Sequence, residues 1–169
     1  MPEYIFDTTV LSNLAAVGRL DLLEKRYRKM AVTTVEVSDE LRRGFQAGYG
    51  YLEDALQQIQ SINPGGWLRI AAPESAAEHQ LRAESDLLLD PGEASCLALA
   101  ISRGLILATD DLAARQLAQE RDVLLTGTVG ILIAMVRDGS LSLTKANAIL
   151  AEMIGLRYRS PVDRLYELI

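Results

Sequence analysis

The chain has 169 residues, of which 49% are hydrophobic and 24% charged, and this balance predicts one globular domain over residues 1–169 rather than a disordered or linker-rich chain. Its formal net charge of −6 has the wrong sign for a protein that holds nucleic acid by its overall charge. With one cysteine, Cys96, and one histidine, His79, a disulfide framework, a cysteine-based zinc site and a multi-histidine metal centre are excluded. No secretory leader and no apolar stretch long enough for a bilayer is found, so we expect a soluble, cytoplasmic protein.

The first half of the chain alternates short apolar runs with amphipathic stretches. The run Tyr4–Phe6 predicts a strand, and the helix that follows it ends at Gly18. The breaker "NPGG" closes the last helix of this half. In chain order, the predicted elements are a strand at Tyr4–Phe6, helices at Thr9–Val17 and Arg19–Tyr27, a strand at Met30–Thr34, a helix within 35–45 and a helix at Tyr51–Ile62.

The second half continues the alternation. Asp90 as N-cap, Pro91 in the first turn and Gly104 past the end frame a clear helix, and "LILATDD" is typical of a strand buried on both faces. The other predicted elements are an edge strand at Trp67–Ala72, a polar exposed helix at Pro73–Glu84, a helix at Ala113–Glu120, a strand at Val123–Leu125, a glycine-framed helix within 127–139, a helix at Leu143–Gly155 and a short helix within 160–169.

Strands that alternate with helices favour parallel pairing, so we predict a three-layer α/β/α sandwich around a central, mainly parallel sheet. Ligands of such sheets bind beyond the carboxyl ends of the strands. Acidic residues occur at those places: Asp7 after the first strand, Asp110 and Asp111 after "LILAT", and Glu93 in the first turn of the helix before it. Glu40 lies on the helix that follows the second strand.

Carboxylates that share one cleft repel each other unless a cation neutralises them. Oxygen ligands without histidine or cysteine point to Mg²⁺ or Mn²⁺. Each acid also has a purely structural explanation, because Asp7, Asp90 and Asp110 are plausible helix N-caps and Glu93 has the spacing of a capping box. Glu36 is the rival of Glu40, one turn earlier on the same helix. Only the acids taken as a set favour a site.

Five stretches in order resemble the PIN-domain family, in particular its compact prokaryotic branch with a "GEA" helix. The likeness runs over nearly the whole chain and implies a metal-dependent ribonuclease, in many cases the toxin of a toxin–antitoxin pair. The matching stretches are "DTTVLSNL" from Asp7, "DELRRG" from Asp39, "DPGEASCLALA" from Asp90, "LATDDLAARQLA" from Leu107 and "GTVGIL" from Gly127.

The resemblance implies roles for individual residues. Asp7 matches the first aspartate of the family, Glu40 the glutamate of the "EL" helix and Glu93 the acid of the "GE" turn. The fourth acid falls in "TDD", where Asp110 and Asp111 both fit. We therefore expect the catalytic set Asp7, Glu40, Glu93 and Asp110, with metal ligands drawn from Asp7, Glu93, Asp110 and Asp111.

Supporting groups follow from the same likeness. Thr9 stands where the family often has a serine or asparagine that can hold a metal-bound water, although a polar first-turn residue is equally ordinary there. Gly127 and Thr128 begin a helix whose N–H groups can bind a phosphate or orient an acid. The stretch 44–89 is longer and more irregular than in minimal toxins, and "TDD" replaces the commoner "TND".

The chemistry implied is hydrolysis of single-stranded RNA, in which a divalent ion lowers the pKa of a bound water and neutralises charge on the scissile phosphate. The products carry a 5′-phosphate and a 3′-hydroxyl. On so acidic a chain, substrate contacts must come from local basic groups such as Arg42 and Arg43, which flank Glu40, although most basic side chains are simply solvated. Further basic residues gather near the end of the sequence: Arg157, Arg159 and Arg164.

Three partners are expected. They are RNA, a cognate antitoxin protein that enters the acidic groove, and a second copy of the chain, docked through apolar helices around Leu141 to Ile154. Two alternative functions stay open: a catalytically silent PIN-like module that binds RNA or protein, and, more remotely, a haloacid-dehalogenase-type phosphatase. The phosphatase needs a lysine before the Asp pair, and only Lys25 and Lys29 precede it.

Overall fold

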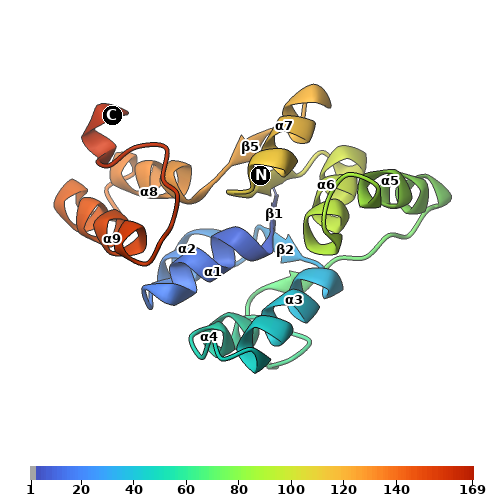
Figure 1. The fold of residues 1–169 in the computed structure, drawn as a ribbon, viewed down its shortest axis with the longest axis horizontal. Helices are drawn as coiled ribbons and strands as arrows, with labels where there is room; N and C mark the ends of the chain where they lie inside the picture. Colours follow the sequence, from blue (N-terminus) through green and yellow to red (C-terminus); the bar gives the residue numbers. More distant parts are fainter. Residues whose placement is uncertain (1–2) are drawn as a thin grey trace.

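The computed structural model describes residues 3–169, which fold around one five-stranded sheet in the order β3-β2-β1-β4-β5 (Figure 1). All four neighbouring pairs of strands are parallel. The strands are only two or three residues long: β1 is Tyr4–Phe6, β2 Ala31–Thr33, β3 Arg69–Ile70, β4 Ile106–Ala108 and β5 Leu125–Thr126.

Helices connect and cover these strands. Their bounds are α1 Thr8–Ala16, α2 Leu20–Tyr27, α3 Val35–Gln46, α4 Leu52–Gln57, α5 Ala76–Asp86, α6 Pro91–Arg103, α7 Leu112–Glu120, α8 Thr128–Arg137 and α9 Leu143–Gly155, followed by a short 3-10 turn at Leu165–Glu167.

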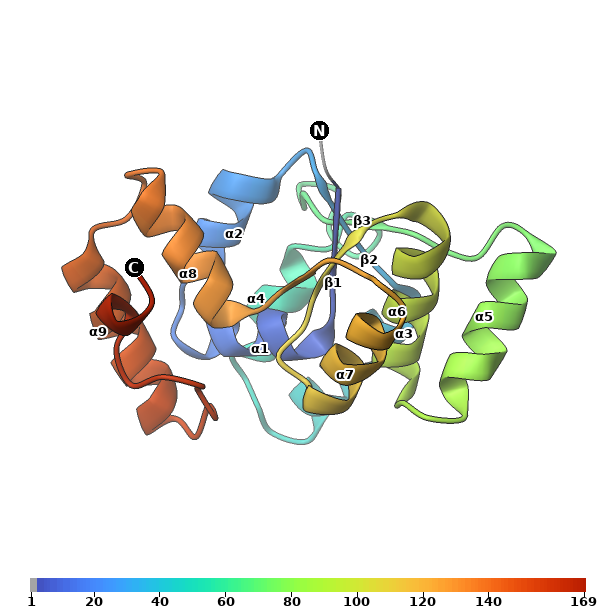
Figure 2. The same ribbon diagram turned by 90° about the horizontal axis from the view of Figure 1, so that it is seen from above.

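The helices form two groups, one on each side of the sheet (Figure 2). Helix α1 packs against α2, α4, α8 and α9, whereas α6 packs against α5 and α7. Helix α3 contacts both α1 and α6. The expected three-layer α/β/α arrangement with a parallel sheet is thereby confirmed, and the sheet is parallel throughout.

Local sequence explains the helices that frame the two central strands. Asp7 caps α1 by accepting hydrogen bonds from the N–H groups of Thr9 and Val10. Helix α6 begins at Pro91 and ends at Gly104, whose φ of +65° is a left-handed conformation that glycine adopts without strain. Leu107 in β4 is fully buried, as expected for a strand covered on both faces.

Some boundaries differ from the prediction. Helix α4 ends at Gln57 rather than Ile62, because the next residues turn into the sheet: Ile59 forms a bridge to Leu68, and the N–H of Gln60 donates to the carbonyl of Leu68 at 2.9 Å. Helix α5 begins three residues later than expected, where Ser75 caps it, and β5 is shifted to Leu125–Thr126. The short helix expected within 160–169 is only a 3-10 turn.

Helix α9 has the predicted bounds but not the predicted surface. Its apolar side chains Ala146, Ile149, Leu150 and Met153 are buried, and the helix packs on α8 and α1. The apolar face proposed for a homodimer is therefore used inside the chain, and the homodimer itself stays a prediction. Within residues 3–169, no helix is long and apolar enough to cross a membrane.

A nearly buried ion pair joins α5 to the end of α6. The carboxylate of Glu78 accepts from Nε of Arg103 at 2.8 Å, from the Ser102 hydroxyl at 3.1 Å and from the N–H of Glu74 at 2.7 Å. These contacts, chiefly the hydrogen bonds from Arg103, lower the pKa of Glu78 from 4.5 to about 2. Helix α5 is thus not the fully exposed helix that its polar sequence suggests.

We expect Glu78→Gln to lower the free energy of unfolding near neutral pH by about 1–2 kcal/mol, because it removes the charged acceptor from Arg103. A carboxyl whose pKa is depressed in the folded state stabilises the fold above the unfolded pKa of 4.5 and loses that contribution as the pH falls toward about 2. The difference between wild type and variant should therefore shrink over that window. Chemical denaturation at several pH values measures it, with the exposed Glu120→Gln as control; a pH-independent difference would contradict the assignment.

Candidate active site

The site lies where the connections of the sheet change direction. From β1 the chain moves outward through β2 to β3, and it then returns to place β4 on the other side of β1 and β5 beyond it. Ligands of open parallel sheets bind at such a switch point, outside the carboxyl ends of the two strands that flank it. Asp7 follows β1 directly, and Thr109, Asp110 and Asp111 follow β4.

Asp7 is fully buried and each of its oxygens has a donor. Oδ1 accepts from the Thr9 N–H at 3.0 Å, the Thr9 hydroxyl at 2.7 Å and the Val10 N–H at 3.2 Å, and Oδ2 accepts from the hydroxyl of Thr109. Burial nevertheless raises the pKa of Asp7 to about 7, with the negative charge of Asp110 adding to the effect. The neighbours hold this carboxyl in place without neutralising it.

Thr9 connects the ends of the two central strands. Its hydroxyl donates to Asp7 and accepts from the N–H of Asp110 at 2.9 Å. Thr109 makes the reciprocal contact from the other strand, since its hydroxyl donates to Asp7 and accepts from the N–H of Asp111 at 3.1 Å. The hydroxyl of Thr9, for which a metal-bound water and an ordinary first-turn role were both open, thus fixes the two acidic segments relative to each other.

Glu93 is half-buried in the first turn of α6. Burial raises its pKa to about 7, and the charges of Asp111, Asp7 and Asp90 raise it further in that order. Glu93, Asp7 and Asp111 therefore share one electrostatic environment, although they come from the ends of three different elements. Among residues 3–169, no Arg or Lys forms an ion pair with any of the three.

Asp110 and Asp111 point to different neighbours. The Asp110 carboxylate accepts from the Asn13 amide at 2.8 Å, the Thr128 N–H at 2.9 Å, the Thr128 hydroxyl and the Tyr158 hydroxyl at 3.3 Å. Asp111 caps α7 through Oδ1, which accepts from the N–H of Ala114 at 2.8 Å. Asp111 thus keeps Oδ2 available beside Glu93, whereas Asp110 is enclosed by donors. Of the two aspartates that fit the "TDD" position, Asp111 is the better candidate ligand.

The N-terminus of α8 orients an acid, which is one of the two roles expected of Gly127 and Thr128. The Gly127 backbone lies close to Asp110 and Arg115. A Cβ added at Gly127 would lie 2.6 Å from Oδ1 of Asp110 and 3.0 Å from a guanidinium nitrogen of Arg115. Glycine is required here by space rather than by backbone conformation.

Glu40 joins three helices at the rim of the site. Its Oε1 accepts from the N–H of Gly92 at 2.8 Å and its Oε2 from the hydroxyl of Thr8. A Cβ at Gly92 would lie 2.4 Å from the Glu40 carboxylate, so the contact needs glycine. The rival Glu36 forms an ion pair with Arg82 at 2.6 Å and faces α5. Glu40 therefore positions the turn that carries Glu93.

The acidic residues suit a hard divalent cation. Asp7, Glu93 and Asp111 supply only oxygen donors, and the pKa values of Asp7 and Glu93 are raised chiefly by burial and further by neighbouring carboxylates, effects that a bound cation would oppose. Within residues 3–169, no three acidic, histidine or cysteine side chains already have the spacing of a metal site. Mg²⁺ or Mn²⁺ would draw these carboxylates together.

Several contacts of the site were not predicted from the sequence. Thr8 and Thr109 are direct neighbours of predicted acids, and Asn13 lies one helical turn after Thr9, so spacing offered a signal for these three. Tyr158 lies 48 residues after Asp110 in the sequence, and no sequence signal connected it with the site. Arg42 and Arg43 are exposed on α3, where Arg42 pairs with Asp39 at 3.4 Å.

The lysines required by the phosphatase alternative are elsewhere. Lys25 lies on α2 and Lys29 just after it, both exposed and both shortly before the amino end of β2. Asp7 lies at the opposite, carboxyl edge of the parallel sheet. This separation removes the lysine that a haloacid-dehalogenase-type site needs.

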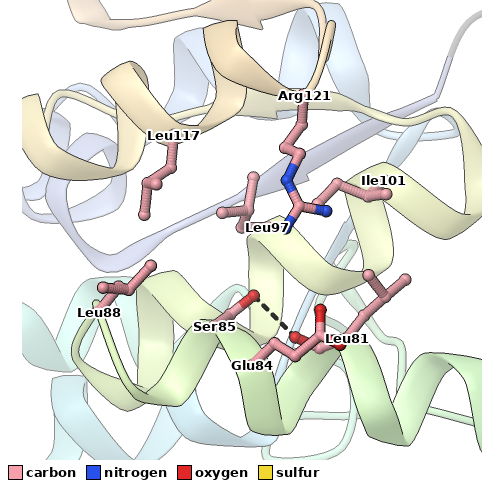
Figure 3. Close-up of a pocket in the computed structure, with 8 residues that line it drawn as sticks. All are labelled: Leu81, Glu84, Ser85, Leu88, Leu97, Ile101, Leu117 and Arg121. Carbon is pink, nitrogen blue, oxygen red and sulfur yellow. Dashed lines mark hydrogen bonds between the residues drawn. The ribbon is translucent and has the colours of Figure 1, made fainter.

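A separate pocket of about 280 Å³ lies between α5, α6 and α7 and contains none of the site carboxylates. Figure 3 shows Leu88, Leu97 and Leu117 on its walls, with Glu84 and Arg121 at opposite sides. The drawn hydrogen bond from the Ser85 hydroxyl to the Leu81 carbonyl is internal to α5. Nothing in this pocket relates it to the acidic cluster.

Comparisons with known proteins bear on the family and the fold. A family model described as a PIN domain matches residues 3–169. The crystal structure of PAE2754 from Pyrobaculum aerophilum has a similar fold, with a TM-score of 0.54 and 19% sequence identity, over 80% of this chain and 98% of that one. No curated protein matches the chain.

Titration with Mn²⁺ should raise the thermal unfolding temperature of the wild-type protein, because a ligand that binds only the folded state stabilises it by about 2.7 kcal/mol at a hundred times its Kd. Asp7→Asn should lose this shift while keeping the cap of α1, since asparagine caps helices as well as aspartate. Asp163→Asn, which removes an exposed charge elsewhere, should keep it. An unchanged shift in Asp7→Asn would place the ion outside this cluster.

The two aspartates after β4 should behave differently when each is changed to asparagine. Asp110→Asn turns an amide toward donors and should cost about 1–3 kcal/mol of stability without metal. Asp111→Asn should keep the metal-free stability within about 0.5 kcal/mol but lose the Mn²⁺ shift. Calorimetry with and without Mn²⁺ separates the two, and the reverse pattern would make Asp110 the ligand.

Proposed function

The chain belongs to the PIN-domain family, and on that basis we propose that it is a divalent-metal-dependent endonuclease that cuts single-stranded RNA. The observation that supports the proposal is that burial and the nearby charges of Asp111 and Asp7 raise the pKa of Glu93 at the switch point of the sheet, while no Arg or Lys among residues 3–169 forms an ion pair with any of the three. Such a cluster is costly to the fold, and phosphodiester hydrolysis is a chemistry that makes use of it.

The proposed ligands are Asp7, Glu93 and Asp111. When bound, Mg²⁺ or Mn²⁺ would supply a water that is nucleophilic near neutral pH and would offset negative charge on the scissile phosphate. The remaining work falls to the chain itself. Thr9 and Thr109 keep the Asp7 carboxyl from rotating, and Glu40 holds the first turn of α6, so that Asp7 and Glu93 keep their positions at the switch point.

Glu40 and Asp110 are proposed as positioning residues rather than ligands. Glu40 accepts hydrogen bonds from Gly92 and Thr8, and Asp110 from Asn13, Thr128 and Tyr158, so each carboxylate already holds neighbouring elements in place. The oxygens of Asp7 also have donors, but Asp7 is proposed as a ligand because its charge acts on Glu93. Glu40 and Asp110 are still expected to matter for activity, because loss of either would displace a neighbouring ligand. The biological role proposed is that of a toxin held in check by an antitoxin, as the family resemblance implies.

The test is cleavage of a panel of single-stranded RNAs by the purified protein with Mn²⁺ or Mg²⁺, followed on denaturing gels with EDTA in parallel. Wild type should cut only with metal, and Asp7→Asn and Glu93→Gln should each reduce the rate at least about a hundredfold, because each removes a proposed ligand charge. Asp163→Asn serves as the control.

Product ends give a second readout. Fragments that carry a 5′-phosphate and a 3′-hydroxyl agree with hydrolysis by an activated water, whereas 2′,3′-cyclic phosphates would show attack by the ribose hydroxyl and contradict the mechanism. Equal inactivity of wild type and variants would favour the catalytically silent binding module instead.

A further inference from the structure

The segment that follows α9 places three residues beside Asp110 in the lining of one cavity: Arg157, Tyr158 and Arg159. It turns back past α8 after leaving the helix (Figure 1). Tyr158 is half-buried and its hydroxyl donates to Asp110 at 3.3 Å, while the two arginines on either side of it are exposed. Among the described residues, neither arginine has a hydrogen-bond or ion-pair partner for its side chain.

The end of α9 fixes how these residues are presented. The N–H of Arg157 donates to the carbonyl of Ile154 and the N–H of Tyr158 to that of Met153, both at 3.0 Å. This is the Schellman arrangement, and it places Arg157 at the left-handed position, with a φ of +75°. Glycine is the usual residue there, because a side chain at positive φ is strained. An unpaired arginine held in a strained conformation beside an acidic site indicates a functional constraint.

Two cavities meet at this segment. The smaller one, of about 340 Å³, is lined by Thr8, Thr9, Asn13 and Arg157. The larger, apolar cavity, of about 560 Å³, has walls from Leu125, Val129 and Ile133. Asp110, Tyr158 and Arg159 line both, so the two cavities adjoin at these residues.

The larger cavity has the volume and character of a small-molecule site: about 300–1,000 Å³, mostly apolar, with a few polar groups at its edge. Two of those polar groups are cationic, since Arg115 lines the cavity as well as Arg159, and the carboxylate of Asp110 at its edge already accepts hydrogen bonds from Asn13 and Thr128. Arg115 donates to the carbonyls of Thr109 at 2.8 Å and Thr126 at 3.2 Å, which fixes its guanidinium at the wall. A flat apolar group with adjacent negative charge fits this combination, and a nucleotide has both.

We propose that Arg157 and Arg159 hold backbone phosphates of single-stranded RNA on either side of Tyr158, and that the apolar cavity takes a base of the same strand. The inference rests on the proposed function and adds to it the path of the substrate. On a chain of net charge −6, two unpaired guanidiniums next to the carboxylates supply the local attraction that the overall charge does not.

The experiment measures binding of a fluorescently labelled single-stranded RNA in EDTA by anisotropy, so that no cleavage occurs. Arg159→Ala and Arg157→Gly should each weaken binding on the order of tenfold and reduce the slope of log K against log salt by about 0.7, the value for one phosphate contact on a single strand. Lys145→Ala, which removes a positive charge from the exposed start of α9, should leave both quantities unchanged.

Two variants distinguish a loss of RNA contacts from a loss of folding stability. Arg157→Gly should raise the thermal unfolding temperature, because glycine relieves the left-handed strain, while binding falls. Ile133→Trp, which fills part of the apolar cavity, should weaken binding without changing the salt slope, because it removes a base contact and no phosphate contact. Its unfolding temperature is measured in parallel.

Unchanged affinity and salt slope in both arginine variants overturn the proposal, and so does a wild-type protein that binds no RNA. Loss of affinity in Arg157→Gly together with a lower unfolding temperature also contradicts it. Failure of this proposal is distinct from failure of the proposed function. If the arginine variants cut RNA as fast as wild type, the substrate path is wrong but the protein is still a nuclease. If RNA binding depends on the two arginines but no RNA is cut, the substrate path stands and the nuclease proposal fails.

Discussion

Burial of the Asp7 carboxyl is the constraint on which the rest of the site depends. A carboxylate removed from water must receive hydrogen bonds, and Asp7 obtains them from Thr9 and Val10 on its own strand–helix turn and from Thr109 at the end of β4. The same two threonine hydroxyls accept from the backbone of Asp110 and Asp111. The donors that make burial tolerable therefore also set the relative positions of the acidic segments that follow the two central strands.

Hydrogen bonding and electrostatic strain are distributed unevenly within the site. Asp110 and Glu40 are supplied with donors on both oxygens, whereas burial and the charges of Asp111 and Asp7 raise the pKa of Glu93. Asp7 combines the two, because its oxygens have donors while burial raises its pKa. Glycines stand at 92 and 127 because a Cβ would lie 2.4 Å from a Glu40 oxygen at the first position and 2.6 Å from an Asp110 oxygen at the second.

The sequence was sufficient for the elements with strong local signals. Helix α6 has a proline at its start and a left-handed glycine at its end, and α9 has a serine cap and a continuous apolar face, so both were predicted almost to the residue. Helix α4 was predicted too long because its end is decided by pairing of Ile59 with Leu68, a contact that helical periodicity does not contain. For the same reason, the acids could be placed at strand ends from the sequence, but the choice between Asp110 and Asp111 depends on Thr128 and Tyr158, which the fold brings from later in the chain.

The order of the strands has a consequence for synthesis. Strand β4 pairs with β1 across about a hundred residues, so a nascent chain that has reached Arg103 already carries Asp7, Glu40 and Glu93 but lacks Thr109 and both aspartates of the later turn. Until β4 inserts beside β1, Asp7 has no donor for its second oxygen, and the carboxyl ends of the central strands stay apart. Such long-range parallel pairing forms late in folding. The acidic cluster is therefore completed only after β4 has been synthesised and has paired with β1.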